Sequence, residues 1–147
     1  MRRLFSLLLI FLLLPLTSCS GTPVDAYELM SEFVSLYGAE GVIYSPGIPE
    51  GSDGYITPGL VERIFLFPEG LGDNFAILLN AHIDSPSECG IFVCSDDGEV
   101  RHAEEVCLER LRTLGGDSGF VKKRGRVVYY ATLSDPDRAE RIFKQII

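Results

Sequence analysis

Four side chains that could act together in nucleophilic catalysis lie close to one another in the middle of the chain: His82, Asp84, Cys89 and Cys94. A thiol beside a histidine and a carboxylate is the set of groups used in acyl transfer and hydrolysis, because the base activates the thiol. Pro86 separates the histidine from the cysteines, so the sequence does not fix their register. We expect a solvated histidine at a strand end beside a loop aspartate. The alternative is a thiol-dependent enzyme that uses Cys89 or Cys94 with His82.

The cysteine spacing argues against a zinc site in this segment. Cys89 and Cys94 are an odd number of positions apart, which points them to opposite faces of one strand, and no Cys-x-x-Cys pair is present. The same geometry prevents a disulfide between these two residues. A disulfide from Cys94 or Cys89 to Cys107 is possible in an extracytoplasmic protein, and Cys94–Cys107 is our candidate pair. We expect no metal, no cofactor and no catalytic residue.

The fourth cysteine, Cys19, lies where an export signal would be cut. Arg2 and Arg3 precede an apolar run at residues 4–14, and this pattern is typical of a signal peptide. The run is shorter than the about 20 apolar residues of a membrane-spanning helix. The segment that follows, Leu16-Thr17-Ser18-Cys19, resembles the bacterial lipoprotein box, in which the cysteine is diacylglycerylated and becomes the first residue of the mature protein.

This motif divides the chain into three parts. We predict a lipoprotein signal peptide at residues 1–18, cleavage between Ser18 and Cys19, a lipidated tether at residues 19–24 and one domain at residues 25–147. A diacylglyceryl group on Cys19, usually joined by an N-acyl chain, supplies the two chains that stable anchoring requires. The protein is then anchored in the cell membrane, on its extracytoplasmic face.

The charge of the mature chain excludes one class of partner. Removal of the leader leaves 11 basic and 21 acidic residues, a formal net charge of −10. Nucleic-acid binding needs a large basic surface, so we expect none. The only basic cluster, at residues 122–126, predicts a solvated hairpin tip, although it could also rest against anionic lipid headgroups. The acidic run at residues 96–99 predicts a turn and a helix cap, because a calcium loop needs about 12 residues.

The pattern of apolar residues predicts a mixture of helices and strands. We expect helices at residues 25–37, 100–114 and 135–146, strands at residues 75–83 and 89–94, a hairpin at residues 120–132, and a turn-rich loop at residues 39–59. Residues 61–67 could form either a strand or a helix. The order favours an α+β two-layer sandwich, in which a small antiparallel or mixed sheet of about four strands carries the helices on one face.

Three segments carry a resemblance to a known group of proteins: residues 88–93, 104–111 and 125–135. With the lipoprotein box, they resemble small Gram-positive lipoproteins, common in clostridia, that carry a domain of unknown function. The resemblance covers residues 75–147, and it offers no catalytic residue to transfer. It implies the fold and the location given above, with the membrane bound through Cys19.

These observations favour a non-catalytic binding or interaction module over an enzyme. The domain would be presented to a protein of the cell envelope. The loop at residues 39–59 could hold a small ligand, which is compatible with this function.

Overall fold

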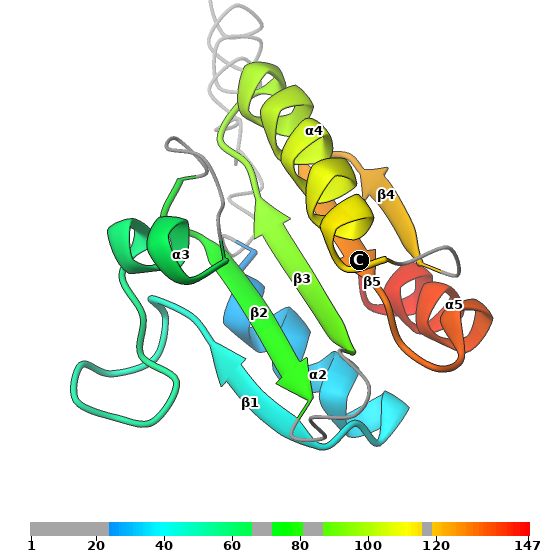
Figure 1. The fold of residues 1–147 in the computed structure, drawn as a ribbon, viewed down its shortest axis with the longest axis horizontal. Coiled ribbons are helices and arrows are strands. Elements are labelled where there is room, and N and C mark those ends of the chain that lie inside the picture. Colours follow the sequence, from blue (N-terminus) through cyan, green and yellow to red (C-terminus); the bar gives the residue numbers. More distant parts are fainter. Residues whose placement is uncertain (1–23, 66–71, 81–86, 116–118) are drawn as a thin grey trace, which may run out of the picture.

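The computed structural model describes residues 24–65, 72–80, 87–115 and 119–147, and these residues form an α+β domain (Figure 1). Its elements, in chain order, are α2 (Ala26–Tyr37), β1 (Gly41–Tyr44), α3 (Pro58–Phe65), β2 (Phe75–Asn80), β3 (Glu88–Val93), α4 (Asp97–Thr113), β4 (Phe120–Arg124), β5 (Val127–Ala131) and α5 (Pro136–Ile146). The predicted α+β class is confirmed.

The strands of the described residues form one open, antiparallel sheet of five strands in the order β1-β2-β3-β5-β4. β3 lies in the centre, as its apolar residues on both faces predict. β3 and β4 are both antiparallel to β5, so they run parallel to each other. α4 makes the connection between them, and β5 is inserted between the two strands that this helix connects.

The additional strand is β1, which lies in the segment expected to be a loop. It is only four residues long, and its whole length pairs with β2, from Gly41 opposite Asn80 to Tyr44 opposite Ile77. The glycines and prolines around it signal turns, and the strand depends on pairing with a partner distant in sequence. Beyond β1, the segment is made of turns, with one parallel bridge between Ser45 and Tyr55.

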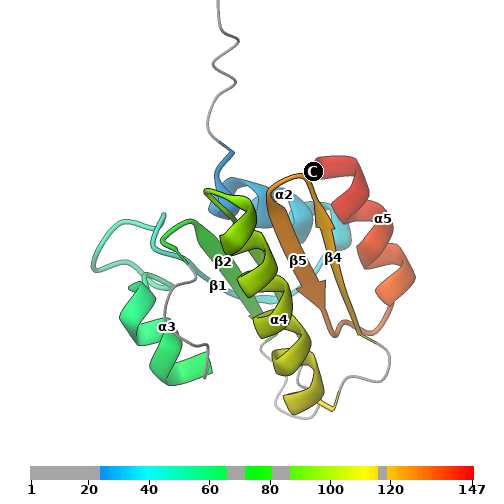
Figure 2. The same cartoon turned by 90° about the horizontal axis from the view of Figure 1, so that it is seen from above.

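The helices cover both faces of the sheet, so the prediction of helices on one face is wrong. α2 and α5 pack on one face, where the rings of Phe33 and Phe143 stack with centroids 4.1 Å apart. α3 and α4 lie on the opposite face, and Figure 2 shows the strands between the two pairs of helices. All five residues of β5 are buried, because alternate side chains enter the two cores. The architecture is therefore a three-layer sandwich.

The ends of the helices follow from local sequence. Asp25, Asp96 and Asp135 each accept hydrogen bonds from backbone N–H groups in the first turn of α2, α4 and α5. α2 ends at Gly38, whose φ of 71° lies in the left-handed region that glycine enters without strain. The turn between β4 and β5 uses Gly125 in the same way, with a φ of 57°. The predicted cap at residues 96–99 and the predicted hairpin are confirmed.

Candidate functional site

The three cysteines of the domain lie in two separate cores. Cys89, on β3, belongs to the core between the sheet and α2, and its thiol lies 3.7 Å from the sulfur of Met30. Cys94 and Cys107 belong to the core on the α4 side. Cys89 and Cys94 therefore lie on opposite faces of the sheet, as their spacing indicates. All three thiols are free and buried, and the Cys94–Cys107 disulfide stays a prediction.

Burial keeps these thiols protonated near neutral pH. Desolvation, together with the negative charges of Glu99 and Asp96, raises the pKa of Cys94 to about 11. Burial also raises the pKa of Cys89 and of Cys107. The thiolate is the nucleophile in cysteine chemistry, so none of the three is activated. The other members of the suggested catalytic set, His82 and Asp84, lie outside the described residues.

A buried cluster of charged and polar groups is the most organised constellation that we find in the described residues. Glu88 opens β3 and its side chain is only 3% exposed. The guanidinium group of Arg110, on α4, donates from Nε to Oε1 of Glu88 at 2.8 Å and from Nη2 to Oε2 at 2.6 Å. The hydroxyl group of Tyr130, on β5, also donates to Oε1. Both carboxylate oxygens are thus bound, and the cluster joins β3, α4 and β5.

The backbone around this cluster is shaped to hold it. Gly90 lies directly opposite Tyr130 in the sheet, and a Cβ atom at this glycine would overlap the tyrosine ring. The ring can therefore lie over Gly90 and extend its hydroxyl group to Glu88. Thr132 fixes the strand end, because its hydroxyl accepts from the Glu88 N–H at 2.9 Å and its own N–H donates to the Glu88 carbonyl at 2.8 Å.

The electrostatics of the cluster favour a structural role. The hydrogen bonds that Arg110 donates to Glu88 raise the pKa of Arg110 above its ordinary value, so the guanidinium stays charged. Burial, with the negative charge of Glu88, raises the pKa of Tyr130 well above its ordinary value, so the phenol stays neutral. Neither Arg110 nor Tyr130 is therefore poised to exchange a proton near neutral pH. The arrangement can orient the strand and the helix.

The sequence analysis did not identify this cluster, although it contained a signal. Each of the three segments that carry the lipoprotein resemblance contributes one member, namely Glu88, Arg110 or Tyr130. An acidic residue at the start of an otherwise apolar, central strand needs a buried cationic partner. That requirement indicates a partner, but only the fold shows which of the chain's basic residues provides it.

The other charged clusters have local partners. In the hairpin cluster at residues 122–126, Lys122 lies 3.8 Å from Glu140, and Lys123 lies 2.6 Å from Glu104. The two arginines donate to backbone carbonyl groups of α5 and of the segment before α4. Asp96, the first residue of the acidic run at residues 96–99, caps α4, as expected. Among the residues that the structure describes, no group of three or more metal-ligating side chains is present.

Described residues line a cavity at each of two opposite ends of the domain. The larger, of about 620 Å³, lies beside the first described residue and is lined by Val24, residues 72–74, residues 93–95, Glu99, Arg126 and Val127. The smaller, of about 240 Å³, lies at the other ends of the same strands and is lined by residues 37–40, Leu78, Ser87, Leu133 and Ser134. Neither one contains an activated nucleophile. Each mixes polar and apolar groups, which suits binding.

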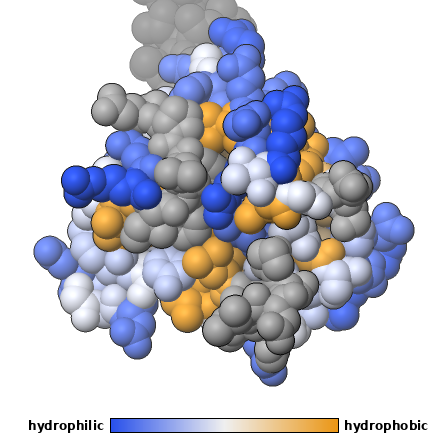
Figure 3. All heavy atoms as spheres, in the orientation of Figure 1, coloured by the Kyte–Doolittle hydropathy of each residue, from blue (hydrophilic) through white to orange (hydrophobic). Residues whose placement is uncertain are grey.

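Apolar groups also reach the surface over the β1 and β2 side of the sheet. α4 packs over β4 and β5. Tyr44 and Leu79, on β1 and β2, face the same side as α4 and are only partly buried. Figure 3 shows apolar side chains in this part of the surface, with hydrophilic groups around them.

Comparison of the chain with protein-family models, curated proteins and solved structures finds no match. The resemblance to clostridial lipoproteins therefore stays a prediction from the residues. The structure adds one finding on membranes: among the described residues, no helix is long and apolar enough to cross a bilayer. The predicted signal peptide and the lipidated Cys19 lie outside the described residues.

Proposed function

We propose that this chain is a lipoprotein anchored through Cys19 on the extracytoplasmic face of the cell membrane, where its domain binds another component of the envelope without catalysis. The leader and the segment Leu16-Thr17-Ser18-Cys19 support the anchor. The three-layer fold, with two cavities that mix polar and apolar groups, supports binding. The net charge of −10 on residues 19–147 disfavours nucleic acid as the partner.

The observation that carries this proposal is the division of the four cysteines. Cys89, Cys94 and Cys107 are buried in the two cores. Each has a raised pKa, and a protonated, inaccessible thiol does not attack a substrate. The remaining cysteine, Cys19, stands at the end of a leader sequence, where a thiol is acylated. The thiol-dependent enzyme named as the alternative therefore has no supporting contact among the described residues.

Detergent phase separation tests the anchor. The native protein should partition into the detergent phase, and the mass of its mature form should show cleavage before Cys19 and the added acyl chains. The Cys19→Ala variant should move to the aqueous phase because it has no acceptor thiol. Cys94→Ala is the matched control, since that thiol is buried and should leave partitioning unchanged. A native protein in the aqueous phase that Cys19→Ala leaves unchanged contradicts the proposal.

Cross-linking on intact membranes tests the binding role. The native protein and the secreted Cys19→Ala form are cross-linked, purified, and compared by mass spectrometry of the captured proteins. A partner that is captured reproducibly by the native form, and lost when its docking surface is mutated, supports an interaction module. Absence of any reproducible partner contradicts it.

A further inference from the structure

The chain enters the domain at a fixed point at one end of the sheet. The side-chain amide of Asn74 donates from Nδ2 to the carbonyl oxygen of Val24 and accepts at Oδ1 from the N–H of Ala26, both at 2.9 Å. These two bonds hold residues 24–26 against the start of β2. Any tether therefore begins at Val24, and the domain cannot release more chain without breaking them.

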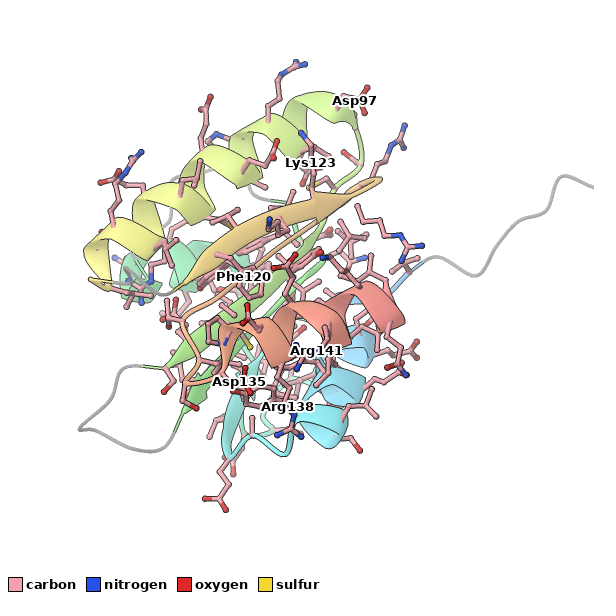
Figure 4. All side chains as sticks on the ribbon, turned by 90° about the vertical axis from the view of Figure 1, so that its right-hand side faces the viewer. Asp97, Phe120, Lys123, Asp135, Arg138 and Arg141 are labelled. Carbon is pink, nitrogen blue, oxygen red and sulfur yellow. The ribbon has the colours of Figure 1, made fainter. Side chains whose placement is uncertain are left out.

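The ends of several other elements gather around this entry point. The turn between β4 and β5 lies against the segment before α4, because the N–H of Cys94 donates to the carbonyl of Arg126 at 2.8 Å. The end of α5 also lies here, because Arg124 donates to the carbonyl of Lys144 at 2.9 Å. Figure 4 shows Asp97, at the start of α4, on the side where the chain enters, and Asp135, at the start of α5, on the opposite side. We call this the entry end.

The covalent reach of the predicted tether is short compared with the domain. Cys19 precedes Val24 by five residues, which span at most about 18 Å when fully extended. α4 has 17 residues, so it runs for about 25 Å away from the entry end. A lipid on Cys19 therefore keeps the entry end next to the bilayer, and the far end of α4 lies beyond the reach of the tether.

We propose that the entry end faces the lipid headgroups and that the opposite end, with the smaller cavity, faces away from the membrane. This inference rests on the proposed anchor at Cys19. The entry end carries the cations Arg124, Arg126 and Lys144 together with the anionic run at residues 96–99. This mixed surface is not basic enough to bind anionic lipid by itself. The tether therefore has to hold it at the membrane. Partners in the envelope then reach the cavity lined by residues 37–40, Leu78, Ser87, Leu133 and Ser134.

Tryptophan fluorescence tests the orientation, because the chain contains no tryptophan. Asp97→Trp at the entry end and Asp137→Trp at the opposite end form a matched pair, since each replaces an acidic residue in the first turn of a helix. The mature chain from residue 19 is coupled through the Cys19 thiol to a maleimide lipid in phosphatidylcholine vesicles that carry a nitroxide on the headgroup. Quenching is compared with vesicles that lack the nitroxide. Uncoupled protein is the background control.

We expect several-fold stronger quenching in Asp97→Trp than in Asp137→Trp. Equal quenching, or stronger quenching in Asp137→Trp, overturns the proposed orientation. If Asp97→Trp does not fold, judged by its circular dichroism, Lys144→Trp in the last turn of α5 reports on the same end. Chemical coupling replaces cellular lipidation, so this result does not depend on the anchor experiment above. The vesicle experiment can therefore refute the orientation, and detergent phase separation can refute the anchor, independently of each other.

Discussion

Replacement of Arg110 by methionine should destabilise the domain strongly. The change leaves the Glu88 carboxylate, 3% exposed, with the Tyr130 hydroxyl as the remaining member of the cluster. Removal of one partner of a buried ion pair costs about 3–5 kcal/mol, because the other charge stays buried without compensation. With a urea m-value of about 1.5–2 kcal/mol per M, this loss lowers the unfolding midpoint by roughly 2–3 M.

The control for this experiment lies one half-turn along the same helix. Arg112 pairs with Glu109 at 2.8 Å, but both side chains are more than two-thirds exposed, at 72% and 71%. Arg112→Met removes the same kind of side chain from a solvated pair, so it should cost less than about 1 kcal/mol. Urea unfolding of the mature chain with Cys19→Ala, followed by circular dichroism, measures both variants. The reasoning is refuted if Arg110→Met costs no more than Arg112→Met.

Three further predictions concern packing, thiol chemistry and capping. Gly90→Ala should destabilise the domain by about 1–3 kcal/mol in urea unfolding, because the new methyl group meets a buried ring, whereas Gly59→Ala, which has open space in α3, should be neutral or stabilising. Cys94, with its pKa raised from 9.0 to about 11, should react with iodoacetamide at pH 8 at least about a hundredfold more slowly than a free thiol, and rapid alkylation of the folded domain would contradict this. The contribution of the protonated Cys94 thiol to stability should be lost as the pH rises from 9 through 11. Asp135→Ala should cost about 1 kcal/mol by removing the cap of α5, and thermal unfolding should show a smaller effect for Asp137→Ala, which caps nothing.

The local signals in the sequence predicted the local structure well. Asp135 followed by proline marks the start of α5, and Gly38 marks the end of α2, because capping depends on residues a few positions apart. These features can be predicted without knowing how the rest of the chain folds.

The features that were missed depend on distant contacts. β1 exists because β2 pairs with it, and Arg110 meets Glu88 because the helix between β3 and β4 crosses the sheet. The second layer of helices could have been inferred. A strand such as β3, apolar on both faces, is central in the sheet and needs cover on both sides.

The insertion of β5 between β3 and β4 has a consequence for a chain that folds as it leaves a translocation pore. β4 pairs with β5 alone, and one edge of β3 stays open until β5 arrives. The packing of α2 also depends on α5, because Phe33 stacks on Phe143. A chain that crosses the membrane with its amino terminus first cannot complete the sheet before β5 has crossed. If the chain is exported as we propose, this order of assembly keeps the sheet incomplete during translocation, and a truncated product would expose an unpaired strand edge.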